Sequence, residues 1–121
     1  MSSVLVVDTS VWIAQFAGRG PDLSARLDDE RVHLHEFILG ELVLGTIPRG
    51  HPSAALLSKV PRVATLSHDE PIAFVRLTRL EGSGIGWSDA HILASVVVSG
   101  AALWTLDKPL RSAANELGVA V

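Results

Sequence analysis

Short apolar runs alternate with stretches of helical periodicity along the whole chain. The run Val4–Val7 holds four apolar residues without polar alternation, which is typical of a strand buried on both faces. Similar runs predict further strands at Val32–Leu34, Val63–Thr65, Ala102–Thr105 and Val119–Val121. Helical patterns fill the intervals, at Thr9–Ala17, Asp22–Asp29, Phe37–Leu44, Ala54–Val60, Pro71–Leu80, Ser88–Ser99 and Lys108–Leu117. Strands that alternate with helices predict an α/β fold, a parallel sheet covered by helices on both faces.

Two helix ends carry local sequence signals. Ser67 and Glu70 have the spacing of a capping box, in which the Ser67 hydroxyl accepts from the Glu70 amide, and they predict the start of the helix Pro71–Leu80. Gly118 suits the position just after the helix Lys108–Leu117.

Composition narrows the class of protein. The 121 residues are 48% hydrophobic, which suits a single globular domain spanning residues 1–121. The chain has no cysteine, which excludes disulfide scaffolds and thiolate metal sites. The longest apolar stretch, Ile92–Trp104, is interrupted by Ser95, Ser99 and Gly100 and is too short to span a membrane. With no basic segment at the N-terminus, we expect a soluble, cytoplasmic protein.

Two aspartates follow predicted strands. Ligands of open α/β sheets bind outside the carboxyl ends of the strands, so Asp8, directly after Val4–Val7, is a candidate site residue. An N-cap for the next helix explains Asp8 equally well. Asp107 follows the strand Ala102–Thr105, and taken alone it is better explained as an N-cap, because Lys108 and Pro109 come next.

Two further acids lie within apolar helical segments. Glu41 lies in Phe37–Leu44, a segment so apolar that we expect burial on most faces, and a buried carboxylate needs a cation or an arginine partner. Asp89 aligns with Leu93 on the apolar side of its helix, although the helix dipole alone favours an acid in the first turn. Trp87, just before it, is expected in the core or an interface rather than as a base-stacking residue. The five histidines show no metal-ligand spacing.

The four acids in order resemble the motifs of the PIN-domain family. Val4–Ile13 resembles the opening of a PIN domain, and Glu41, Asp89 and Asp107 follow in Gly40-Glu41-Leu42, Gly86-Trp87-Ser88-Asp89 and Thr105-Leu106-Asp107. The resemblance covers nearly the whole chain and is closest to the VapC toxins of bacterial toxin–antitoxin pairs. It implies a three-layer α/β/α fold with strand order 3-2-1-4-5, and an endoribonuclease that uses Mg²⁺ or Mn²⁺. It also implies a VapB-type antitoxin partner and a homodimer, for which Trp12 and Leu77–Leu80 are our guesses at the dimer surface.

The donor chemistry agrees with that resemblance. Four carboxylates without cysteine form a hard, oxygen-rich set that suits Mg²⁺ or Mn²⁺. We assign Asp8 as the central ligand, Asp89 and Asp107 as further ligands, and Glu41 as a ligand or a base that positions water. The hydroxyl of Thr9 or Ser10 is a candidate to hold a water ligand of the ion or a phosphate oxygen. The net charge of −3 becomes +1 when these four acids are set aside, so bulk charge does not exclude an RNA substrate.

Two other functions compete with this interpretation. A receiver-type signalling domain has a similar length and also opens with a strand followed by an acid. A receiver needs a phosphoacceptor aspartate after its third strand, however, and Leu66-Ser67 follows Val63–Thr65 here. A PIN-like domain that only binds a partner is the second alternative.

Overall fold

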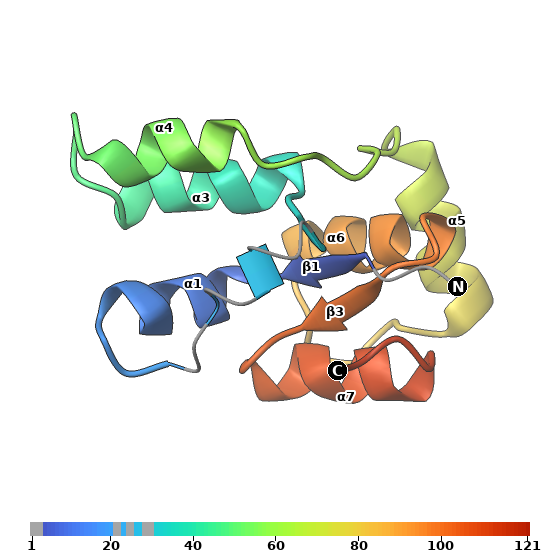
Figure 1. Ribbon diagram of the computed structural model, residues 1–121. Coiled ribbons are helices and arrows are strands. Elements are labelled where there is room, and N and C mark those ends of the chain that lie inside the picture. The colour runs from blue at the N-terminus through green and yellow to red at the C-terminus, as the bar shows by residue number, and fades with distance from the viewer. Residues whose placement is uncertain (1–3, 21–22, 24–25, 28–30) are drawn as a thin grey trace.

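The predicted strands meet in a parallel sheet with β1 at its centre. The computed structural model describes residues 4–20, 23, 26–27 and 31–121. In it β1 (Leu5–Val7) pairs in parallel with β2 (Val32–His33) on one side and with β3 (Ala102–Trp104) on the other (Figure 1). All three residues of β1 are buried, as expected for the middle of a sheet covered on both faces.

Single bridges extend both edges of this sheet. Leu34 forms a parallel bridge with Arg62, and Leu103 forms one with Ala120. The order along the sheet is therefore residue 62, β2, β1, β3, residue 120, which confirms the predicted α/β class and agrees with the expected order 3-2-1-4-5.

Two predicted strands are wrong in extent. Val63–Thr65 and Val119–Val121 form no strand of their own beyond those bridges. Val63 is buried, but Ala64 and Thr65 are exposed and gain no packing from continued pairing. At the chain end only Val121 continues past the bridge, where its N–H donates to the Leu103 carbonyl.

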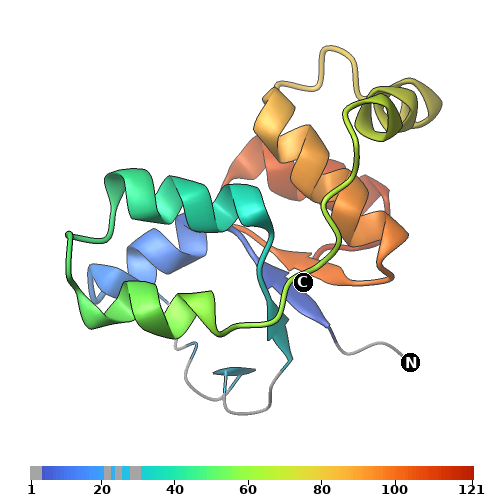
Figure 2. The ribbon, with the colours of Figure 1, turned by 90° about the horizontal axis from the view of Figure 1, so that it is seen from above.

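The helices begin and end within two residues of their predicted bounds. Figure 1 shows α3, α4 and α6 on one side of the sheet and α7 on the other, and Figure 2 shows α3 and α4 side by side. The predicted helix Asp22–Asp29 falls largely outside the described residues. The observed helices are α1 (Thr9–Phe16), α3 (Glu36–Gly45), α4 (Pro52–Ser58), α5 (Asp69–Thr78), α6 (Trp87–Val98) and α7 (Lys108–Glu116).

The core lies between these layers. Helix α6 is its most deeply buried helix, because every residue from Ala90 to Val96 is buried. Trp12 is only 3% exposed and its indole N–H donates to the Val7 carbonyl, so it belongs to the core and our guess that it forms a dimer surface is wrong. Among the described residues, no helix combines the length and the apolar character needed to cross a membrane.

The start of α5 differs from the predicted capping box. The helix begins at Asp69, and its N-cap His68 makes no side-chain capping bond. The Glu70 amide donates to the backbone carbonyl of Ser67, at 3.1 Å, rather than to its hydroxyl. The turn before the helix thus satisfies this amide through the backbone, and the capping-box interpretation is wrong.

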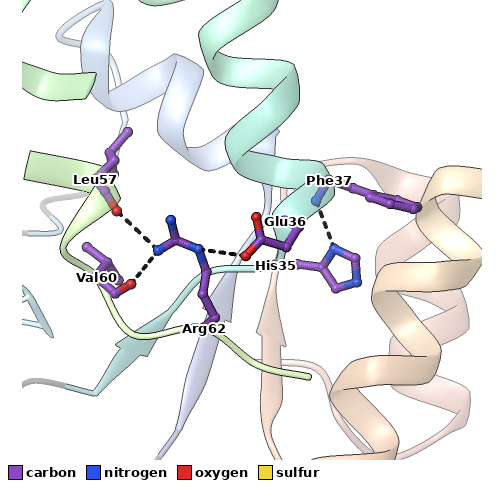
Figure 3. Close-up of polar contacts among 6 residues, drawn as sticks. All are labelled: His35, Glu36, Phe37, Leu57, Val60 and Arg62. Carbon is purple, nitrogen blue, oxygen red and sulfur yellow. Dashed lines mark hydrogen bonds and ion pairs between the residues drawn. The ribbon is translucent and has the colours of Figure 1, made fainter. Parts of the chain in front are cut away.

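Arg62 ties the edge of the sheet to the start of α3. Its Nε donates to Glu36 at 3.1 Å, and its Nη1 donates to the carbonyls of Leu57 and Val60 (Figure 3). His35 caps the same helix, because its Nδ1 accepts from the Phe37 amide at 3.0 Å. These contacts fix the N-terminal end of the helix that carries Glu41.

Candidate active site

Asp8 lies at the carboxyl end of β1, where the chain turns into α1. It is 5% exposed, and its Oδ2 accepts three hydrogen bonds, from the Ser10 amide (3.2 Å), the Ser10 hydroxyl (2.6 Å) and the Thr105 hydroxyl (2.8 Å). Within the described part of the chain, no donor bonds to Oδ1. Asp8 is thus both the N-cap of α1 and a fixed carboxylate with one oxygen still available.

Two hydroxyl groups link β1 to the loop after β3. Each hydroxyl has one proton, and both donate it to Asp8. As acceptors, the Ser10 oxygen binds the Leu106 amide (2.9 Å) and the Thr105 oxygen binds the Asp107 amide (3.0 Å). The two strand ends that carry Asp8 and Asp107 are therefore held in register by side chains as well as by the sheet.

Asp107 caps α7, as its sequence position suggested. Its Oδ2 accepts from the Leu110 amide at 3.1 Å, and Pro109 occupies the first turn of the helix. The side chain is exposed, so capping leaves its other oxygen open to solvent. For Asp8 and Asp107, the sequence offered two explanations, a helix cap or a site residue. The geometry is compatible with each aspartate serving in both roles.

Glu41 is exposed, which contradicts the expectation that its helix is buried on most faces. In α3, Ile38 and Leu42 pack into the core, but Val43 and Leu44 are 53% and 90% exposed because no other part of the described chain covers that face. No arginine of the described ranges forms an ion pair with Glu41. Its two oxygens instead accept from the hydroxyls of Thr9 (3.1 Å) and Ser88 (2.9 Å). These bonds join α1, α3 and α6 around one carboxylate.

The carboxyl group of Asp89 is partly buried and interacts electrostatically with all three other acids. The pKa of its carboxyl is raised from 3.8 to about 6, first by burial and then by the negative charges of Asp8, Asp107 and Glu41, in that order, while a backbone hydrogen bond at Gly86 opposes them. As predicted, Asp89 shares its helix face with Leu93, which is fully buried. The fold therefore brings the four candidate acids into one electrostatic field, although they are up to 99 positions apart in the chain.

The four acids do not form a closed ligand shell. Among the described residues, no three acidic or histidine side chains are arranged closely enough to hold a metal ion as they stand. The hydroxyl groups of Thr9 and Ser10 donate to Glu41 and Asp8, and their role toward a water or a phosphate oxygen stays a prediction. They orient the carboxylates.

Sequence reasoning missed two residues of this network, Thr105 and Ser88. Thr105 ends the predicted strand Ala102–Thr105, two residues before Asp107, and Ser88 directly precedes Asp89. A hydroxyl residue beside a candidate acid at an element end is the signal that could have found both.

Metal-free Asp89→Asn protein is expected to be more stable than the parent at neutral pH. The folded-state pKa of Asp89 lies above its ordinary value, so the folded protein loses stability as the pH rises from about 4 to about 6. Above that range the ionised carboxylate costs about 1 kcal/mol, once screening at this partly exposed site is allowed for. Urea unfolding in EDTA at pH 7.5 and pH 4 should show the gain at the higher pH only. Equal or lower stability at pH 7.5 would argue against a shared carboxylate field, and Asp69→Asn, an exposed acid of α5, is the control.

The sequence matches the family model described as the PIN domain over residues 5–116. This chain belongs to the PIN domain family, which confirms the resemblance and removes the receiver-domain alternative. It is also similar to two proteins named Ribonuclease VapC32, from the Mycobacterium tuberculosis strains CDC 1551 / Oshkosh and ATCC 25618 / H37Rv. Each is 39% identical to it over 119 residues, which cover 98% of this chain and 96% of the relative.

Proposed function

We propose that this protein is a metal-dependent endoribonuclease, the toxin of a toxin–antitoxin pair. The observation that carries the proposal is that hydroxyl groups fix the carboxylates of Asp8 and Glu41 beside the segments that carry Asp107 and Asp89. The raised pKa of Asp89, caused by burial and by the three other acids, agrees with this grouping. Clustered carboxylates repel one another, and no basic side chain in the described part of the chain forms an ion pair with these four. A bound cation would relieve the repulsion, which is a reason to regard the cluster as a functional site. The 39% identity to proteins named as ribonucleases supports RNA as the substrate.

The donor type of these residues fits Mg²⁺ or Mn²⁺, although the described side chains would have to move closer together to hold the ion. All four side chains offer carboxylate oxygen, which is the donor these ions prefer, and the chain has no thiol that would favour softer metals. Asp8 would be the central ligand, because its Oδ2 is fixed by three hydrogen bonds while Oδ1 is available. Asp89 and Asp107 would complete the set, with Glu41 as a ligand or as the group that positions water.

A bound divalent ion supplies positive charge for the phosphodiester and lowers the pKa of water, so that in-line attack on phosphorus becomes possible at neutral pH. The protein's part is to orient the groups around the reaction. Glu41, held by two hydroxyl groups, presents a carboxylate that can accept a proton from water. Ser10 and Thr105 keep the Asp8 carboxylate in one orientation, so little reorganisation is needed during the reaction.

We further propose that a VapB-type antitoxin neutralises this activity in the cytoplasm and that the protein forms a homodimer. A cluster of four carboxylates attracts arginine or lysine for the same reason that it attracts metal. Exposed apolar side chains supply surface for protein contacts, among them Leu44 (90% exposed), Leu56 (65%) and Leu77 (84%). Leu80, by contrast, is 6% exposed, so of the guessed dimer segment Leu77–Leu80 only the part around Leu77 is available.

Co-expression with the product of the neighbouring small open reading frame is expected to yield a stable complex and to restore growth to cells that the protein alone inhibits. Size-exclusion chromatography with light scattering gives the mass of the complex and of the free protein, for which we expect a dimer. A harmless 12.9 kDa monomer that ignores the neighbour's product would support the alternative of a PIN domain without catalytic activity.

A further inference from the structure

A tryptophan opens the helix that carries Asp89. Trp87 is the first residue of α6 and is 46% exposed, so of the two places expected for it, the core or an interface, the core is excluded. The next residue, Ser88, donates its hydroxyl to Glu41, and Asp89 follows. Only one residue, Ser88, thus separates this exposed tryptophan from Asp89 in the chain.

The ring of Trp87 rests on buried histidine. The His91 ring lies 4.6 Å from it, centroid to centroid, at an interplanar angle of 78°, and is itself fully buried. His91 Nε2 lies 2.8 Å from His68 Nδ1, and the His68 ring lies 6.1 Å from Trp87. An aromatic side chain held in this way offers a preset surface, because binding against it orders few further rotamers.

A cavity of about 320 Å³ lies against Trp87, between α5 and α6. Its walls are largely apolar and include Ile72, Val75 and Ile85. Arg76 and Glu81 also line it, and neither forms an ion pair with any other described residue. The cavity thus combines an aromatic wall with one free donor group and one free acceptor group.

We propose that this cavity binds a nucleobase of the RNA that flanks the scissile phosphate, stacked on Trp87. The inference rests on the proposed ribonuclease function and adds a residue that selects the cleavage position. Stacking on an aromatic ring suits any base, and a cation and a carboxylate can then meet the donor and acceptor edges of that base or the neighbouring phosphate. Gly86 and Trp87 line the cavity, and the next residue, Ser88, donates to Glu41, so the cavity and the carboxylates both lie at the first turn of α6. This placement favours substrate over a second protein chain as the occupant.

Binding is measured best without cleavage, in the Asp8→Asn background, by fluorescence anisotropy with an end-labelled RNA oligonucleotide of mixed sequence. Removing one stacked base contact costs about 1–3 kcal/mol, so Trp87→Leu should weaken binding by about 5-fold to 140-fold, whereas Trp87→Phe should retain most of the affinity. Arg76→Gln, an exposed change that leaves the helix core untouched, should weaken binding as well. Val98→Ser, which changes an exposed apolar residue at the end of α6 outside the cavity, is the control and should bind like the parent.

Sequencing the 5′ ends of RNA fragments cut by proteins with Asp8 intact supplies the second measurement. Trp87→Leu should flatten the preference for bases next to the cut, and Trp87→Phe should preserve it. Unchanged binding and an unchanged cleavage map in both Trp87→Leu and Arg76→Gln would overturn the inference, as would loss of a dimer by Trp87→Leu with RNA binding intact. If the wild-type protein neither binds nor cuts RNA, the proposed function itself fails. Failure of the inference alone looks different, because the wild-type protein then binds and cuts RNA and the variants behave in the same way.

Discussion

Asp8→Asn is expected to abolish RNA cleavage, lowering the rate by about 10³-fold or more, while the fold remains intact. The amide oxygen can replace Oδ2 and still accept from Ser10 and Thr105, so the cap of α1 and the link to the loop after β3 survive. The amide nitrogen then takes the place of Oδ1, where it carries no negative charge for a cation. Cleavage of a labelled RNA by the purified variant, beside its circular dichroism spectrum and melting curve, measures both halves of this prediction.

Asp69→Asn is the matched control, because it removes one negative charge from an exposed position in α5 and should leave cleavage unchanged. An Asp8→Asn protein that cuts RNA at close to the wild-type rate would reduce Asp8 to a helix cap.

Millimolar Mn²⁺ or Mg²⁺ is expected to raise the melting temperature. Binding only to the folded state at 100 times the dissociation constant adds about 2.7 kcal/mol, which for a domain of this size corresponds to about 10 °C. The repulsion that raises the pKa of Asp89 is relieved at the same time. Differential scanning fluorimetry in EDTA and in each ion, at matched ionic strength, measures the shift.

The double variant Asp89→Asn/Asp107→Asn provides the comparison for this shift. It should melt at least as high as the parent in EDTA and gain little from either ion. Equal metal-induced shifts of the melting temperature in parent and double variant would indicate that the ion binds elsewhere in the protein. No shift in the parent would count against a metal site.

Much of the fold could be predicted from the sequence because the strongest patterns are the most buried ones. Val4–Val7 has no polar alternation and forms the centre of the sheet, and the apolar side of Ser88–Ser99 becomes the most buried helix. The predicted edge strands are shorter than expected, because Ala64, Thr65 and Val121 are exposed and gain little packing from continued pairing. Local patterns do not report such exposure.

The candidate site was only partly predictable, for a related physical reason. Asp8 and Asp107 follow from the rule about strand ends, and Asp89 follows from its position on an apolar helix face. The environment of Glu41 did not follow, because an apolar helix sequence does not reveal whether a partner chain or solvent covers its outer face. The hydroxyl bonds from Ser88 and Thr105 join residues 47 and 97 positions apart, and only the tertiary fold brings those residues together.

The central claim is that the four carboxylates support metal-dependent attack of water on an RNA phosphodiester. The most direct measurement is incubation of EDTA-stripped protein with an end-labelled RNA, with and without added Mn²⁺, followed by identification of the new fragment ends. We expect cleavage only with the added ion, and fragments that carry a terminal phosphate monoester opposite a free hydroxyl. Cleavage that persists in EDTA, or ends that carry a 2′,3′-cyclic phosphate from attack by the ribose hydroxyl, would contradict the account.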